Sequence, residues 1–135
     1  MKTFTYTFTV PQDAIDHNGH VHNVTYLSWM IEAATKHSES VGYGYEACSA
    51  LGGAWVAKSH HIAYKAPAFK DEVLRMETWI DEIGKLKSTR KYRLVNEKSS
   101  AVVCEGETEW VFVDTKRMRP MRIPVEISTR FLQDN

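Results

Sequence analysis

The first residues of the chain alternate strictly between polar and apolar side chains. Within residues 3–10 every second residue is a threonine, and the residues between them are Phe, Tyr, Phe and Val. A period of two in β-favouring residues is typical of a strand that buries one face. We therefore predict a β-strand over residues 3–10, ended by Pro11, and a polar loop over residues 11–23.

A helical period replaces this alternation further along the chain. From Val24 to Val41, apolar residues recur at steps of three and four, as they do on the buried face of an amphipathic helix. The residues of this face are Leu27, Met30, Ile31, Ala34 and Val41. Asn23 is a suitable N-cap and Gly42 a suitable stop, so one long helix is predicted between them. A loop or short helix is expected over residues 43–51.

The remainder of the chain is dominated by strand-like patterns. Four long strands are predicted at residues 54–65, 72–82, 86–96 and 101–114, with a last short strand at 121–123 and a helical tail from Pro124. Alternation within two of these strands predicts one shared face for Leu74, Met76, Thr78 and Ile80, and another for Leu86, Tyr92 and Leu94. Because short turns favour antiparallel neighbours, we expect consecutive strands to pair. The order of elements predicts an α+β fold in which one long central helix is wrapped by a bent antiparallel sheet of five to six strands. Residues 1–135 are expected to form a single domain.

Composition narrows the class of function. The chain has 135 residues, of which 43% are hydrophobic and 25% charged, as in an ordinary folded domain. Lys plus Arg equals Asp plus Glu at 17 each, so no net charge favours nucleic acid or an anionic membrane as a partner. The N-terminal alternation is unlike a signal peptide, and no apolar run reaches the roughly 20 residues of a membrane span. The two distant cysteines, Cys48 and Cys104, are expected as buried free thiols in a cytoplasmic protein.

The candidate chemistry is concentrated immediately before the long helix. The stretch from Asp16 to Asn23 holds a carboxylate, three histidines and Gly19. A helix N-terminus offers unpaired backbone N–H groups and a positive dipole end, which suit a developing oxyanion. Asp16 is therefore a candidate acid/base group for attack on a carbonyl carbon, with the N–H groups of His22 and Asn23 as oxyanion hole. A turn-capping Asp16 and an ordinary solvated helix terminus are the alternatives.

The histidines of this stretch have the residue type of metal ligands. His20 and His22 lie two residues apart, and Asp16 offers an oxygen ligand. No further His or Cys pair has the spacing of a tetrahedral site, so neither a metal nor a cofactor is predicted. His20 is instead expected to orient Asp16 or to tune its ionisation, with an inert imidazole as the alternative.

The element order and this stretch together resemble the hotdog fold and, more narrowly, the 4-hydroxybenzoyl-CoA thioesterase-like family of acyl-CoA thioesterases. The pattern Asp-x-Asn-x-His-Val-x-Asn-x-x-Tyr occurs in long-chain acyl-CoA and acyl-carrier-protein thioesterases of this kind. Its members here are Asp16, Asn18, His20, Val21, Asn23 and Tyr26, with Gly19 also matching the family. A second family pattern, Tyr-x-x-Pro-x-x-x-Asp, stands at Tyr64, Pro67 and Asp71.

This resemblance implies hydrolysis of acyl-CoA or acyl-carrier-protein thioesters to a free acid and a thiol. Asp16 would act as nucleophile or general base, Gly19 would let the backbone approach the thioester, and Tyr26 would belong to the site from the central helix. A non-catalytic acyl-CoA binding module and a hotdog dehydratase or isomerase are the alternative functions. A homodimer is expected because a single-layer sheet leaves exposed surface at its edge and along part of the helix. The resemblance implies that such dimers pair further, as a dimer of dimers.

A CoA substrate brings further residues into consideration. Coenzyme A presents phosphates, and basic side chains at the mouth of the cleft are the expected contacts. Ordinary basic residues on the solvated face of the sheet are the alternative. The candidates are Lys58, Arg90 and Arg93. Trp55, Trp79 and Trp110 either line an acyl pocket or fill the core.

Overall fold

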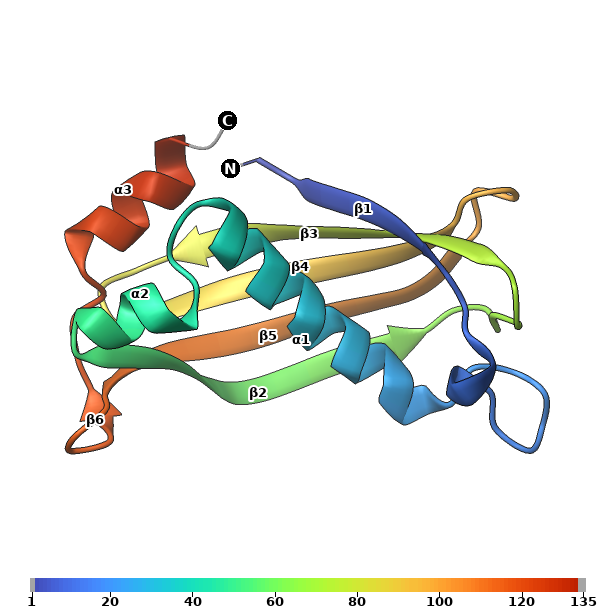
Figure 1. Ribbon diagram of the computed structural model, residues 1–135, viewed down its shortest axis with the longest axis horizontal. Coiled ribbons are helices and arrows are strands. Elements are labelled where there is room, and N and C mark those ends of the chain that lie inside the picture. The colour runs from blue at the N-terminus through green and yellow to red at the C-terminus, as the bar shows by residue number, and fades with distance from the viewer. Residues whose placement is uncertain (1, 134–135) are drawn as a thin grey trace.

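One long helix lies against a curved antiparallel sheet in the computed structural model, which describes residues 2–133 (Figure 1). The strands are β1 (Phe4–Thr9), β2 (Gly53–Tyr64), β3 (Val73–Ile83), β4 (Lys87–Asn96), β5 (Val102–Asp114) and β6 (Arg119–Pro120). The helices are α1 (Asn23–Ser40), α2 (Tyr45–Ala50) and α3 (Val125–Gln133), with a 3-10 turn at Gln12–Ala14. The α+β arrangement predicted from the sequence is confirmed.

The sheet has six strands in the order β1-β3-β4-β5-β2, with β6 paired to β5. All pairs are antiparallel, and β3, β4 and β5 follow one another as expected. The expectation that β2 pairs with the strand after it is wrong, because residues 65–72 carry the chain to β3 at the other side of the sheet. Pro67 lies in this connection and lacks the N–H that a continuing strand needs. As a result, β2 and β1 form the two edges of the main sheet.

Burial alternates along the strands and separates an inner face from an outer one. The buried residues of β3 include Leu74, Met76, Thr78 and Ile80, the set expected on one face. Those on the inner face of β4 are Ser88, Arg90, Tyr92 and Leu94. Leu86, expected beside Tyr92 and Leu94, precedes β4 and is 41% exposed.

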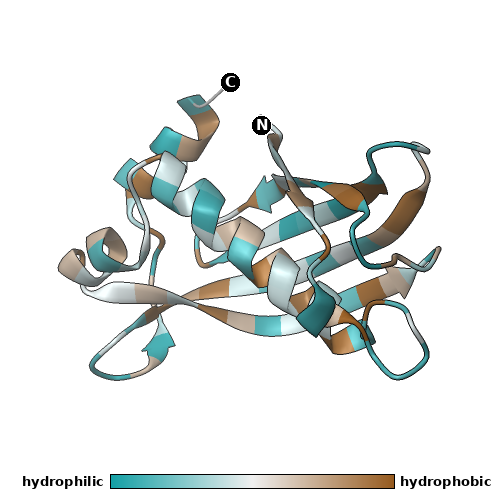
Figure 2. Ribbon diagram, turned by 45° about the vertical axis from the view of Figure 1, so that its right-hand side comes forward, coloured by the Kyte–Doolittle hydropathy of each residue, from teal (hydrophilic) through white to brown (hydrophobic). Residues whose placement is uncertain are grey.

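Helix α1 lies across the inner face of the sheet. Its buried residues are Tyr26, Met30, Ala33, Ala34 and His37. Figure 2 shows hydrophobic and hydrophilic positions mixed along this helix, in keeping with one covered and one open side. Helix and sheet meet closely at Gly106 of β5, where an added Cβ atom would lie 2.5 Å from Met30 Sδ. Met30 therefore occupies the space that a side chain at position 106 would need.

The buried apolar residues form two clusters along the helix. The first surrounds the N-terminal part of α1 and includes Val21, Tyr26, Met30, Leu74 and Leu94. The second includes Val41, Cys48, Ile80, Phe112, Ile127 and Phe131. Since Ile127 and Phe131 come from α3, the C-terminal helix covers the end of the core that α1 reaches last.

Three local predictions have clear outcomes. The N-cap of α1 is His22 and not Asn23, because His22 Nδ1 accepts a hydrogen bond from Val24 N–H at 3.2 Å. The strand expected at residues 121–123 is wrong, since the last pairing involves residues 119–120. Both cysteines are buried and free, as predicted. Within residues 2–133, no helix is long and apolar enough to cross a membrane.

Candidate functional site

A closed loop between the 3-10 turn and α1 holds the predicted carboxylate. Asp16 N–H donates to His20 O at 2.9 Å, and Gly19 N–H donates back to Asp16 O at 3.1 Å. Gly19 has φ +88°, a conformation that glycine adopts without strain. An added Cβ at Gly19 would meet nothing within 4 Å, so backbone conformation and not crowding accounts for the glycine.

The second sequence pattern fixes this loop from the other side. Val21 N–H donates to Ala68 O at 2.9 Å, and Tyr64 O–H donates to Asn23 O at 3.3 Å. Both partners come from the connection that follows β2 or from the end of that strand. Ala68 was not among the predicted residues, because its contribution is a backbone carbonyl that no side-chain pattern reveals.

The Asp16 carboxylate is oriented by hydrogen bonding and by nearby imidazoles. Its Oδ1 accepts the Asn18 N–H at 2.8 Å, and its Oδ2 lies 3.8 Å from His20 Nδ1. Desolvation acts to raise the pKa of Asp16, but the backbone N–H groups of Asn18 and His20 and the imidazoles of His20 and His17 outweigh it. The pKa therefore lies below its ordinary value of 3.8, and Asp16 is ionised at neutral pH.

His20 is placed where the sequence expected an orienting residue. Its Nδ1 lies 3.8 Å from Asp16 Oδ2 and 3.3 Å from Val21 O. The side chain is 39% exposed, whereas that of Asp16 is 14% exposed. A half-open imidazole beside a more covered carboxylate is suited to tuning the charge of that carboxylate.

The start of α1 offers one backbone donor where two were expected. His22 N–H is not free, because it donates to Ala14 O at 2.9 Å, so its predicted place in an oxyanion hole is wrong. The N–H groups of Val24 and Thr25 are also engaged, by His22 Nδ1 and His22 O. Within residues 2–133, the Asn23 N–H has no hydrogen-bond partner. It alone of these four donors at the helix start remains available to an oxyanion.

Tyr26 is a core residue. It is 3% exposed and packs edge-on against Trp29, with ring centroids 5.7 Å apart, and at 5.7 Å from Tyr64. Burial raises the pKa of Tyr26 to about 12, so its hydroxyl stays protonated at neutral pH. These contacts make Tyr26 a packing residue that fixes the first turn of α1 against Trp29 and Tyr64.

The three basic residues expected at CoA phosphates lie in different surroundings. Lys58 on β2 forms an ion pair with Glu109 at 3.6 Å. Arg93 on the outer face of β4 lies 3.8 Å from Glu77 and 5.5 Å from the Trp79 ring. Arg90 is 4% exposed on the inner face of the sheet and so does not lie on the solvated face.

The sequence already contained the signal that separates Arg90 from Arg93. Arg90 lies two residues before Tyr92 and four before Leu94, and residues at even spacing share one face of a strand. The expected inner face at Tyr92 and Leu94 therefore includes Arg90. Arg90 Nη1 contacts His37 Nδ1 at 2.9 Å and donates to Thr78 Oγ1 at 3.1 Å.

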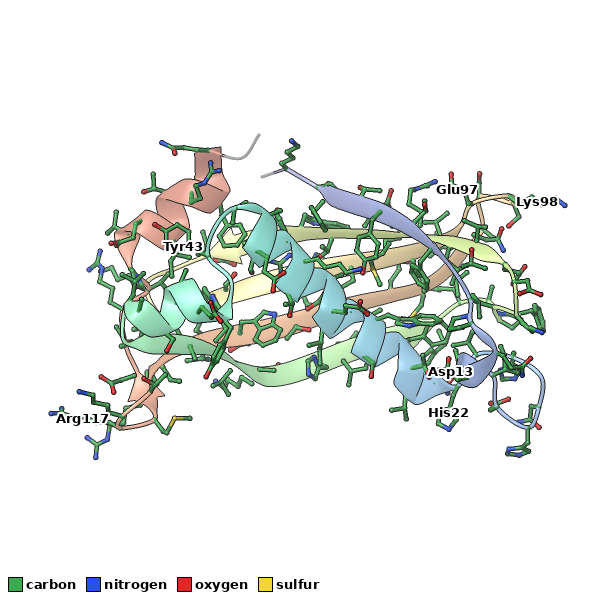
Figure 3. All side chains as sticks on the ribbon, viewed as in Figure 1. Asp13, His22, Tyr43, Glu97, Lys98 and Arg117 are labelled. Carbon is green, nitrogen blue, oxygen red and sulfur yellow. The ribbon has the colours of Figure 1, made fainter. Side chains whose placement is uncertain are left out.

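A cavity lies at the opposite end of α1 from Asp16. It has a volume of about 200 Å³ and is lined by residues of α1, α2, α3 and the inner face of the sheet, among them Ser38, Tyr43, Trp55, Ser88, Arg90 and Trp110. Figure 3 shows Tyr43 and His22 at opposite ends of α1. The sequence left an acyl pocket and the core as alternatives for three tryptophans. Trp55 and Trp110 line this cavity, whereas Trp79 lies on the outer face of the sheet beside Arg93. In residues 2–133, no group of three or more His, Cys, Asp or Glu side chains is arranged to bind a metal ion.

The chain is similar to known proteins over nearly its whole length. Residues 10–131 match the family model described as the thioesterase-like superfamily. The chain is 26% identical over 130 residues to the acyl-CoA thioester hydrolase YbgC of Escherichia coli, with 96% of each chain covered.

Solved structures with the same fold include a CoA thioesterase and a protein in complex with CoA. The 1,4-dihydroxy-2-naphthoyl-CoA thioesterase of Synechocystis has a TM-score of 0.90 at 19% identity, with 98% of each chain covered. A Staphylococcus aureus protein in complex with CoA has a TM-score of 0.91 at 20% identity, covering 97% of this chain and 82% of that one. The hotdog fold expected from the sequence is thereby confirmed.

Proposed function

The chain belongs to the thioesterase-like superfamily, and on that premise we propose that it hydrolyses acyl-CoA thioesters to a free acid and coenzyme A. The observation that carries this proposal is the ionised Asp16 carboxylate. A closed loop holds it, and this loop leads into α1 at Asn23, whose N–H has no hydrogen-bond partner among residues 2–133. Sequence similarity to an acyl-CoA thioester hydrolase supports the same substrate class. Acyl-carrier-protein thioesters present the same reacting carbonyl and are the second substrate class we propose.

Asp16 is the proposed nucleophile or general base, and the two routes differ in whether a covalent intermediate forms. In both routes the ionised carboxylate reacts, and its pKa below the ordinary value keeps it in that form at neutral pH. In the nucleophilic route, an Asp16 oxygen bonds to the thioester carbon and the C–S bond breaks, releasing the thiolate, which takes a proton from water. Water then splits the resulting mixed anhydride into free acid and the Asp16 carboxylate. Hydroxylamine added during turnover would convert this anhydride to a hydroxamate on the Asp16 side chain, detectable by mass spectrometry of the protein. The free acyl hydroxamate is not diagnostic, because hydroxylamine also forms it directly from the thioester.

Asn23 is the proposed donor to the developing oxyanion. Its N–H lies at the positive end of α1, an 18-residue helix, and has no partner among residues 2–133. One such donor contributes on the order of 3 kcal/mol to transition-state stabilisation. Gly19 and His20 serve the reaction by shaping the loop and by holding the charge of Asp16.

The assembly and the CoA contacts are further parts of the proposal. We propose a homodimer, with pairing into a dimer of dimers, because β2 is an open edge strand that exposes Val56 and Tyr64. Lys58 and Arg93 are proposed to contact CoA phosphates by exchanging their present carboxylate partners for phosphate oxygens. Residues 1–135 are proposed to form one domain, since both apolar clusters share one sheet. A cytoplasmic location stays a prediction.

Thiol release from a panel of acyl-CoA and acyl-carrier-protein thioesters tests the proposed reaction. The panel should vary the acyl group from short to long chains and include aryl groups. Release of free thiol with an equal amount of acid supports hydrolysis. Binding of acyl-CoA without thiol release would instead support a non-catalytic binding module, and hydration or a double-bond shift without thiol release would support a dehydratase or isomerase.

A further inference from the structure

A buried guanidinium without a carboxylate partner lines the cavity at the C-terminal end of α1. Arg90 is 4% exposed, and among residues 2–133 it forms no ion pair. Burial lowers the pKa of Arg90 to about 10, which leaves it protonated at neutral pH. A buried charge of this kind is costly unless an anion or several hydrogen bonds compensate for it.

The protein itself satisfies only part of this guanidinium. Nη1 contacts His37 Nδ1 and Thr78 Oγ1, at 2.9 and 3.1 Å. A guanidinium carries five N–H donors, and those on Nε and Nη2 have no hydrogen-bond partner among residues 2–133. The hydroxyl of Ser88, two residues earlier on the same face of β4, also makes no hydrogen bond to that part of the chain. Both residues line the cavity, so it presents a cation and a hydroxyl donor from one strand.

Apart from the hydroxyl groups of Thr35, Ser38 and two tyrosines, the rest of the cavity wall is apolar and largely aromatic. Trp55, Trp110, Tyr43 and Phe131 contribute rings, and Ala34 and Ile80 contribute aliphatic surface. The Phe131 ring also lies 5.9 Å from the Arg90 guanidinium carbon, so α3 covers the charged end. A volume of about 200 Å³ exceeds the roughly 150 Å³ of an engineered cavity that binds benzene. The space therefore suits a ring or a short alkyl chain with one small polar group.

We propose that this cavity binds a small apolar carboxylate, with its carboxylate on Arg90 and Ser88 and its apolar body between the aromatic side chains. A planar guanidinium matches a carboxylate with two parallel hydrogen bonds, and the burial of Arg90 strengthens both. The site is separate from Asp16 of the same chain. Ala34 lies 11 residues beyond the first residue of α1, which corresponds to roughly 16 Å along the helix axis.

Binding of benzoate and its neutral isostere benzamide to the wild-type protein tests this proposal. The probes are titrated to about 10 mM with no thioester present, using calorimetry and the fluorescence of Trp55 and Trp110. Benzoate should bind at least about tenfold more tightly than benzamide. Acetate should not compete, and hexanoate shows whether an alkyl body replaces the ring. Equal binding of benzoate and benzamide, or no saturable binding of benzoate, would overturn the proposal.

Three variants locate the effect. Arg90→Met should remove the preference for benzoate, whereas Arg75→Met, which removes an arginine from the ion pairs of β3, should retain it. Ala54→Leu fills the cavity from β2 and should weaken the binding of both benzoate and benzamide. This variant keeps the test decisive if Arg90→Met fails to fold. Retention of the preference in folded Arg90→Met would contradict the proposal. Because no thioester is used, this result is independent of the outcome for hydrolysis.

Discussion

Asp16 combines the two properties that a hydrolytic carboxylate needs, charge and fixed orientation. Its charge is maintained by the Asn18 N–H and by imidazoles, and its position is set by two backbone hydrogen bonds with His20 and Gly19. The sequence predicted the residue and its neighbours. It did not reveal that His22 N–H is already bonded to Ala14 O, because that contact depends on how the loop folds back.

Replacing His20 should raise the pKa of Asp16. In His20→Ala the imidazole near Oδ2 is lost, so one of the positive charges that favour the ionised carboxylate disappears. The pKa of the Asp16 carboxyl should move upward toward its ordinary value, and the acid limb of kcat/KM should move upward with it. Carbon-detected NMR titration of the Asp16 carboxyl measures the change. His61→Ala on β2 is the control, and an unchanged pKa in His20→Ala would show that His20 is an inert imidazole.

At the scale of elements, α1 packs closely on β5 because position 106 of β5 is a glycine, which has no side chain. Gly106→Ala would place a Cβ 2.5 Å from Met30 Sδ and 2.9 Å from Met30 Cε. Overpacking of this kind destabilises a core by about 1–3 kcal/mol. Chemical denaturation should show a loss in that range. Gly84→Ala, where the nearest atom is Lys87 O at 3.6 Å, should change the free energy of unfolding by far less.

A double substitution separates crowding from other effects of the alanine. Met30→Val shortens the side chain that meets position 106, so Gly106→Ala should cost less in that background than in the wild type. Equal losses in the two backgrounds would show that Met30 does not set the distance between α1 and β5.

Helices and strands with a clear hydrophobic period were the ones that the sequence located correctly. Strict alternation located β1 and β3, and the helical period located α1 to within a residue at each end. The pairing of β2 was missed because consecutive strands were expected to pair, whereas the eight residues from Lys65 to Glu72 cross to another strand. Pairing partners depend on packing across the whole sheet, which local patterns do not encode.

At the scale of the whole molecule, the open edge at β2 is the feature that calls for a partner. The strand has 12 residues, pairs with β5 on one side only, and exposes Val56. Long unpaired edges of this type favour pairing with another chain. We predict a dimer or tetramer by light scattering. Val56→Asp should lower the mass toward that of a monomer, since like charges would face each other across a symmetric contact.

A matched control keeps this result specific to the edge. Val125→Asp removes an apolar side chain from α3 that is 63% exposed, against 40% for Val56, and should leave the mass unchanged. A wild-type protein that stays monomeric at all concentrations would contradict the proposed assembly.

Thiol release by Asp16→Asn tests the central claim most directly. Asn preserves the shape of the side chain but lacks the negative charge that the proposed mechanism requires, so kcat should fall by about a thousandfold or more. Asp13→Asn is the control, because Asp13 is exposed in the 3-10 turn three residues earlier (Figure 3) and should retain activity within about twofold. With both variants folded, the account predicts loss of thiol release in Asp16→Asn alone. Wild-type rates in Asp16→Asn would contradict it.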